Sequence, residues 1–137
     1  MHKILIIVIA ALTLLQACSI IYEDIEENED YIEFKYLLQW DPSPEAEVNS
    51  PGGGYVIYYA QGNTVDINKS CYVDVPYNGG SITPCEKILS IKIKKNTDTN
   101  TGTKTYTFSA VVVSYGTFYG IKAYSNPSNK ITFTIQL

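Results

Sequence analysis

The stretch that decides the fold is IEFKYLLQWDPSP, residues 32–44. Its first half alternates apolar and polar residues, which is the period of a β-strand with one buried face. The alternation continues into an apolar segment that ends at Trp40. Pro42 and Pro44 then end the strand, because proline cannot donate a backbone hydrogen bond to a neighbouring strand. The stretch therefore predicts a strand followed by a loop.

The same signal recurs along the rest of the chain. Short apolar or alternating runs are separated by segments rich in Gly, Asn, Asp and Pro, which favour turns. No segment after Cys18 has a persuasive helical period. The expected strands cover 32–40, 55–59, 71–75, 88–93, 106–113 and 130–135. Six or seven short strands in about 105 residues predict an all-β fold, an antiparallel β-sandwich.

Four of these segments together resemble a fibronectin type III domain, an immunoglobulin-like sandwich of about seven strands. They are LQWDPSP, GYVIYY, YTFSAVVV and AYSNPSNKITF, at 38–44, 54–59, 106–113 and 123–133. The resemblance implies that they are the B, C, F and G strands of a domain that covers residues 32–137. It also implies that Trp40 is the core tryptophan of strand B. Tyr106 would then be the tyrosine-corner residue where strand F begins.

Residues 1–17 have the composition of a secretory signal peptide. Lys3 precedes the apolar run 4–15, which is broken only by Thr13. As a helix this run spans about 18 Å, too short for a hydrocarbon core of about 30 Å. A charged start, a short apolar centre and small residues near the end are typical of a signal that is cleaved.

The end of this segment resembles the lipobox of bacterial lipoproteins. Leu15-Gln16-Ala17-Cys18 has the pattern of an aliphatic residue, a variable one, a small one and a cysteine. The resemblance implies that the Cys18 thiol is acylated and that the chain is cut before it. Two or three lipid chains, at about 0.8 kcal/mol per buried methylene, would hold the protein stably on a membrane. Ser19 in the next position implies the outer membrane, by resemblance to Gram-negative lipoproteins. The alternative is a buried N-terminal helix that ends in a cysteine by chance.

Residues 18–31 are expected to form an acidic tether between the anchor and the sandwich. Ten of the fourteen acids lie between Glu23 and Glu47, most densely in EDIEENED at 23–30. Such a charge run repels itself and extends in solution. The leading strand A of the family would have to lie in the same segment, so it is expected to be short, displaced or missing. A missing strand would leave an open sheet edge to which a partner strand could add.

The composition argues against several classes of function. Cleavage before Cys18 removes the single histidine, and the chain has no arginine, which leaves nine lysines against fourteen acids. A nucleic-acid partner is not expected, because the basic footprint is absent. An enzyme is not expected either, because a Ser-His-Asp or Cys-His site needs a histidine. No cofactor or metal is expected, since the chain has no EF-hand calcium loop and no histidine to complete a zinc site.

Cys71 and Cys85 remain as an even pair once Cys18 is assigned to the anchor. An exported protein meets an oxidising compartment, so a disulfide between them is expected. Closing a loop of about 15 residues would contribute roughly 3 kcal/mol to stability. The alternative is two free thiols.

The candidate binding residues are aromatic. The chain has 12 tyrosines and 4 phenylalanines, and SYGTFYG at 114–120 falls in the expected F–G connection. Tyr115, Phe118 and Tyr119 lie beside glycines, as in paratopes where tyrosine offers a large contact area at low entropic cost. The alternative is that these rings only cover the end of the sandwich.

These features predict a lipid-anchored protein of the cell envelope, at the outer membrane, on its periplasmic face or at the cell surface. Its expected role is that of a non-catalytic binding or scaffolding module. Its expected partners are the membrane, through the lipid, and another envelope protein or a glycan. One alternative is a subunit of a larger envelope assembly that docks by strand addition, which predicts an unpaired apolar edge beside the B strand. The other is a carbohydrate-recognition module, which predicts a row of coplanar exposed rings.

Overall fold

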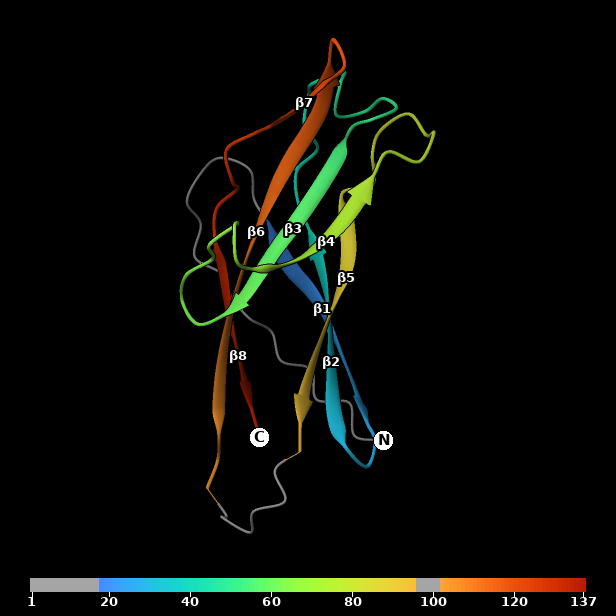
Figure 1. Cartoon of the computed structure of the whole chain (residues 1–137). Coiled ribbons are helices and arrows are strands. Elements are labelled where there is room, and N and C mark those ends of the chain that lie inside the picture. The colour runs from blue at the N-terminus through green and yellow to red at the C-terminus, as the bar shows by residue number, and fades with distance from the viewer. Residues whose placement is uncertain (1–17, 96–101) are drawn as a thin grey trace.

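The structure, a computed structural model, describes residues 18–95 and 102–137. These residues form eight strands and no helix, arranged as two antiparallel sheets that make a sandwich (Figure 1). The predicted all-β sandwich is therefore confirmed. The expected signal peptide, residues 1–17, lies outside the described residues. In the described part of the chain, no helix is long and apolar enough to cross a membrane.

The first sheet has the strand order β1-β2-β5, in which β2 holds the stretch that predicted the fold. The bounds are Ser19–Glu27 for β1, Tyr31–Gln39 for β2 and Glu86–Lys94 for β5. Phe34, Tyr36 and Leu38 of β2 are buried, and the residues between them are partly exposed. β5 alternates in the same way, so both strands bury one face, as the period of two predicts.

The second sheet is built around the long strand β6 (Thr105–Phe118), which pairs with β3 (Gly54–Gln61) on one side. β4 (Cys71–Pro76) adds to the other side of β3. The far side of β6 is shared, because its first half pairs with β8 (Ile131–Gln136) and its end pairs with β7 (Ile121–Tyr124). The last strand is thus divided in two by a segment that contains Pro127, which explains a count of eight strands instead of seven.

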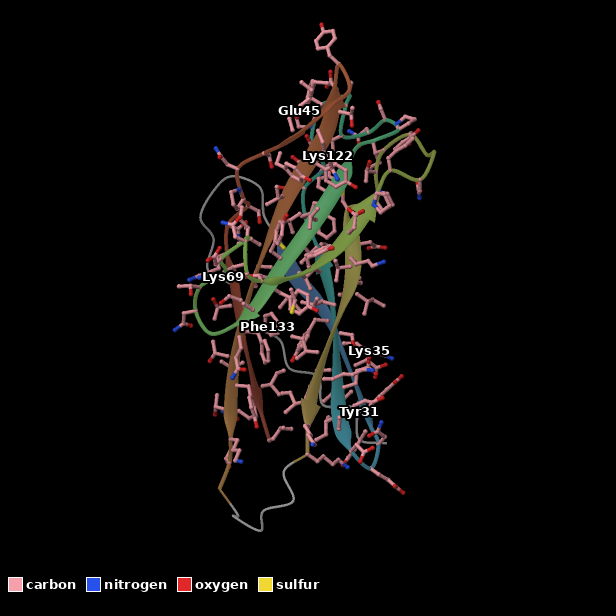
Figure 2. All side chains as sticks on the ribbon, in the orientation of Figure 1. Tyr31, Lys35, Glu45, Lys69, Lys122 and Phe133 are labelled. Carbon is pink, nitrogen blue, oxygen red and sulfur yellow. The ribbon has the colours of Figure 1, made fainter. Side chains whose placement is uncertain are left out.

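The core lies between the two sheets, with one of the two expected fold markers inside it and the other packed against its margin. Trp40 follows β2 directly, is buried, and packs edge-on against Tyr55 with ring centres 5.3 Å apart. Tyr106 is the second residue of β6 and packs against the core from its margin. Phe133 of β8 stacks on Phe108 and contacts Tyr36 of the opposite sheet (Figure 2).

The acidic segment that was expected to be a tether forms strand β1 instead. Residues 19–27 pair with β2 along their length, with one bulge between Ile20 and Tyr22. Lysines from elsewhere in the sequence offset the acid repulsion: Lys35 lies 2.7 Å from Glu26, and Lys95 lies 2.5 Å from Glu27. A strand therefore precedes β2 in the sheet, and the edge that a missing strand would have left open beside β2 is filled.

The expected disulfide between Cys71 and Cys85 is not formed, and both residues are free thiols. Cys71 begins β4 opposite Tyr59, whereas the Cys85 sulfur lies 3.8 Å from the Tyr55 hydroxyl. Tyr55 and Tyr59 are four residues apart on β3, which corresponds to about 13 Å along a strand. The register of β3 and β4 therefore separates the two cysteines beyond the reach of a disulfide.

Tyr55 makes the stability of the sandwich sensitive to alkaline pH. Its buried hydroxyl oxygen accepts a hydrogen bond from the Ser43 N–H at 2.7 Å, and burial raises its pKa to about 12. A tyrosine in the unfolded chain has a pKa of about 10. The unfolded chain therefore loses this proton first as the pH rises, so the stabilisation is complete below about pH 10 and is lost towards pH 12.

We expect the urea midpoint of unfolding to fall steeply between about pH 10 and pH 12. Replacement of Tyr55 by Phe should make this fall shallower, since one of the groups that ionise on unfolding is then gone. The exposed Tyr72, replaced by Phe, is the matched control and should leave the pH profile unchanged. Identical profiles for the Tyr55 variant and the wild type would contradict the assignment.

Candidate functional site

The aromatic stretch 114–120 is a β-hairpin and not the loop that the sequence predicted. β6 continues to Phe118, and β7 begins at Ile121, so only two residues make the turn. Tyr119 and Gly120 both have positive φ, 50° and 80°, as a type I′ turn requires. The tight turn lets the hairpin project from one end of the sandwich (Figure 1).

The hairpin presents apolar side chains to solvent around this turn. Tyr119 at the apex is fully exposed, Ile121 is 71% exposed, Tyr124 is 55% exposed and Phe118 is 36% exposed. We call these four residues the aromatic hairpin. Phe118 and Tyr119 are thus accessible, as the binding prediction requires, but Tyr115 is only 4% exposed. Sequence reasoning missed Ile121 and Tyr124, because it assigned 114–120 to a loop and did not expect a strand that begins at Ile121.

Tyr115 supports the hairpin from below. Its hydroxyl donates a hydrogen bond to Asp74 Oδ1 at 2.8 Å, and burial together with this carboxylate raises its pKa. Lys122 Nζ lies 4.0 Å from the centre of the Tyr115 ring, and the Tyr124 ring packs at 5.9 Å. Figure 2 shows Lys122 at the end of the molecule where the hairpin projects, far from Tyr31 at the opposite end. The pair Tyr115–Asp74 therefore fixes the base of the hairpin to β4.

A hollow of about 210 Å³ lies beside the base of the hairpin. Phe118, Tyr124 and Glu45 are among the residues that line it. The hollow is small, open and formed by residues that also shape the hairpin. It extends the apolar surface and adds one acidic group to its rim.

The second sheet is apolar on its outer face as well as its inner face. Val56 and Val113 are paired partners that alternate with core residues along β3 and β6, yet both are buried. Beside them Tyr58 and Tyr72 form a ring pair with centres 6.4 Å apart, and Tyr72 is largely exposed. The unbroken apolar runs YVIYY and AVVV in the sequence indicate this apolar outer face, because a strand that is apolar on both faces does not alternate.

Cys18, the expected lipidation residue, lies in the core between the sheets. It is 3% exposed, and its backbone N–H donates to Asn129 Oδ1 at 3.2 Å. Burial raises the pKa of its thiol to about 12, so the side chain is neutral at physiological pH. In this position Cys18 packs as a small apolar residue.

Two tyrosine hydroxyls, those of Tyr55 and Tyr115, have raised pKa values. Among the described residues, no group of three or more His, Cys, Asp or Glu side chains could hold a metal ion. The pKa shifts of Tyr55 and Tyr115 hold both hydroxyls neutral, well away from the range in which a general base works near pH 7.

No protein-family model matches this chain, and neither the curated proteins nor the solved structures contain a significant match to it. The function is therefore inferred from the residues of the chain and their geometry.

Proposed function

We propose that this chain is a lipid-anchored protein of the cell envelope that acts as a non-catalytic binding or scaffolding module. The β6–β7 hairpin is its contact surface. The observation that carries this proposal is the exposure of four large apolar side chains on one projecting turn. A clustered apolar projection of this kind marks an interaction site. Tyrosine and phenylalanine add a large contact area there, with few rotatable bonds to immobilise.

The fold supports a binding module of the fibronectin type III kind. The segments assigned to strands B, C and F are β2, β3 and β6, and the segment assigned to G is β7 with β8. Two antiparallel sheets around a buried Trp40 agree with that assignment. Sandwiches of this class present variable surfaces at the ends of their sheets, where the hairpin lies.

The lipobox LQAC supports anchoring through Cys18 at the outer membrane. Acyl chains do not fit the position of Cys18 in the core, so anchoring requires this residue to leave that position. Cys18 is the residue directly before β1. The bulge after Ile20 separates the first two residue pairs between β1 and β2 from the remaining pairs. Release of residues 18–20 would leave the pairing of residues 22–27 with β2 in place.

An envelope protein is a better partner for the hairpin than a glycan. Glycan binding predicts a row of coplanar rings, but the ring pairs Tyr115–Tyr124 and Tyr58–Tyr72 are each tilted by 50°. The hairpin also projects outward, which suits insertion into a concave protein surface. Addition of a partner strand beside β2 is not a route, because β1 and β5 occupy both of its sides.

The test is recovery of a partner from the native envelope with the lipidated protein as bait. A variant with Phe118, Tyr119 and Ile121 each replaced by Ser should recover the partner at least about tenfold less efficiently, which corresponds to about 1.4 kcal/mol. Ile88→Ser is the matched control, since Ile88 is 52% exposed on β5 of the other sheet. Equal recovery by the hairpin variant and the wild type, at equal thermal stability, would rule out the hairpin as the contact surface.

A further inference from the structure

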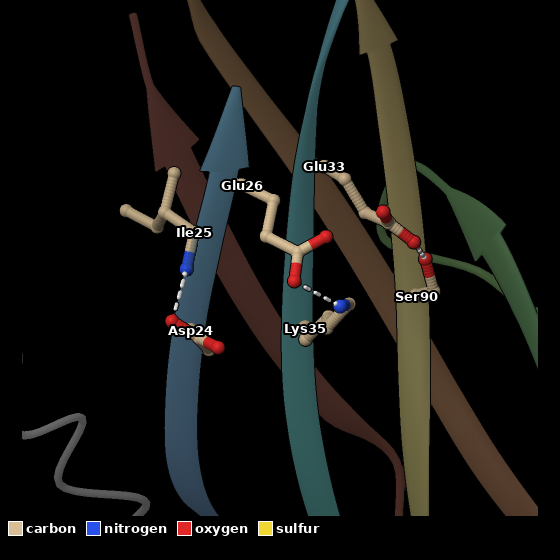
Figure 3. Close-up of polar contacts among 6 residues, drawn as sticks. All are labelled: Asp24, Ile25, Glu26, Glu33, Lys35 and Ser90. Atoms are coloured by element: carbon tan, nitrogen blue, oxygen red, sulfur yellow. Dashed lines mark hydrogen bonds and ion pairs between the residues drawn. The ribbon is translucent and has the colours of Figure 1, made fainter. Parts of the chain in front are cut away.

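The two edges of the first sheet carry opposite charges. β1 is one edge strand of this sheet and β5 is the other. The nine residues of β1 include four acids and no base, whereas β5 has three lysines and one acid. Figure 3 shows the two strands on either side of β2, with Asp24 and Glu26 on the acidic side. The charges that would meet in a contact between copies are those of Asp24 and Glu26 on β1 and of Lys92 and Lys94 on β5.

Internal pairing leaves part of this charge free on each edge. Glu26 pairs with Lys35 and Glu27 pairs with Lys95. Asp24 lies opposite Lys35 and accepts the Ile25 N–H, but it forms no ion pair within 4.0 Å among the described residues. On β5, Lys87 and Lys94 are exposed and form no ion pair with any residue that the structure describes. The second half of β1 therefore keeps exposed acidic charge, and the second half of β5 keeps exposed basic charge.

Asp24 and Glu26 of β1 lie on the same outer face of the sheet as Lys92 and Lys94 of β5, and all four lie in the second halves of their strands. Glu26 is opposite Glu33 of β2, and Glu33 is opposite Lys92 of β5, so these three form one row across the sheet. Ser90 donates a hydrogen bond to Glu33, which fixes the middle of this face (Figure 3). A further copy placed beside β5 would continue the row with its own Glu26 next to Lys92.

The direction of the strands selects one way of continuing the sheet. β1 and β5 are both antiparallel to β2, so they run parallel to each other. A copy shifted sideways across the sheet would therefore bring the acidic second half of its β1 beside the second half of β5, which holds Lys92 and Lys94. The reversed direction would bring the same acids beside Glu86 and Ile88, where they gain little.

We propose that copies of this chain associate head to tail through these edges, with β1 of one copy beside β5 of the next. Charged residues on an edge strand normally prevent pairing between copies, and two β1 edges do repel each other. Edges of opposite sign prevent pairing of like edges and favour pairing of unlike ones. Such a contact is heterologous, so it produces a ring or a filament instead of a closed dimer. It requires neither the lipid anchor nor the aromatic hairpin.

Sedimentation velocity of the full chain in a non-ionic detergent tests this proposal. We expect species larger than one copy at about 20 mM NaCl, and at least about tenfold weaker association at about 500 mM, because salt screens exposed charges. All variants share residues 1–17, so any association through that segment is the same in each of them. Thermal unfolding of every variant checks the fold, which should tolerate the loss of exposed pairs.

Charge reversal on the two edges distinguishes this contact from any other. On the outer face of the sheet, Asp24→Lys with Glu26→Lys makes the second halves of both edges basic, and Lys92→Glu with Lys94→Glu makes both acidic. Each variant alone should therefore remain a single copy. An equimolar mixture of the two should associate again, and so should a chain that carries all four changes. A single copy at low salt for the wild type would overturn the proposal. So would association that survives either reversal alone, including a β5–β5 dimer that ignores the change in β1.

Discussion

Replacement of Gly53 by Ala is expected to remove most of the stability of the sandwich. A Cβ atom at this position would lie 2.0 Å from the carbonyl oxygen of Glu47 and 2.6 Å from that of Val48. Both are backbone atoms, which cannot rotate away as the end of a long side chain can. Overpacking a protein interior typically costs 1–3 kcal/mol. Because two carbonyl groups are met at once, we expect a loss of more than about 3 kcal/mol.

The turn that contains Glu47 cannot retreat to make room. Val48 is fully buried in the core, and its carbonyl oxygen accepts a hydrogen bond from Thr83 Oγ1 at 2.7 Å. On its other side the turn touches Gly116 of β6, where an added Cβ would come within 2.8 Å of the Glu47 Cβ. Gly53 and Gly116, which have no side chain, thus allow the turn to pack closely against the sheet that carries the aromatic hairpin. Movement of the turn would also disturb the base of the candidate site.

Urea unfolding of the Gly53→Ala chain measures the effect. Gly102→Ala is the matched control, because an added Cβ there meets no atom within 4 Å and its φ is not in the left-handed region. The control should change the free energy of unfolding by less than about 0.5 kcal/mol. If the free energy of unfolding of the Gly53→Ala chain were within about 0.5 kcal/mol of the wild-type value, the turn would have to move to make room for the Cβ atom. The burial of Val48 argues against such a movement.

The fold could be predicted where a strand buries one face and exposes the other. β2, β5 and β8 alternate strictly, and their positions agree with the expected strands to within two residues. β1 could not be predicted in this way, because its acids predict repulsion and the lysines that offset it come from distant positions such as Lys95. The sequence could not place Cys71 and Cys85 relative to each other for a related reason. The number of residues between two cysteines does not give the register of the strands near which they lie.

The candidate site could be predicted only in part. The glycines and aromatic residues of 114–120 correctly indicated an exposed feature, and Gly120 occupies a turn position with positive φ. Which rings face solvent depends on where the strand ends, and that depends on the pairing of β6 with β7. Tyr115 lies within the paired region and is buried, whereas Tyr124 lies opposite it and remains exposed. Local sequence alone does not contain this pairing.

Replacement of Cys18 by Ser is expected to abolish lipid attachment and to leave the chain uncut. The acyl acceptor in the proposed anchor is the Cys18 thiol, and a serine hydroxyl is a far weaker nucleophile at neutral pH. Incorporation of a labelled fatty acid in the native host should therefore be lost completely. The mass of the recovered chain should include residues 1–17. Cys71→Ser is the matched control, since Cys71 is an exposed free thiol outside the lipobox and its replacement should leave label and cleavage unchanged.

The same variant distinguishes anchoring from a purely structural role for Cys18. If Cys18 served only the core position that it occupies, Ser would bury a hydroxyl among apolar residues and lower stability by about 1–3 kcal/mol, with no change in label or mass. Anchoring predicts the opposite pattern, because the acylated residue has left the core. Replacement of Asn129 by Ala provides the complementary measurement, as its side chain accepts the Cys18 N–H. In the anchored protein that bond is already broken, so Asn129→Ala should change the free energy of unfolding by less than about 0.5 kcal/mol.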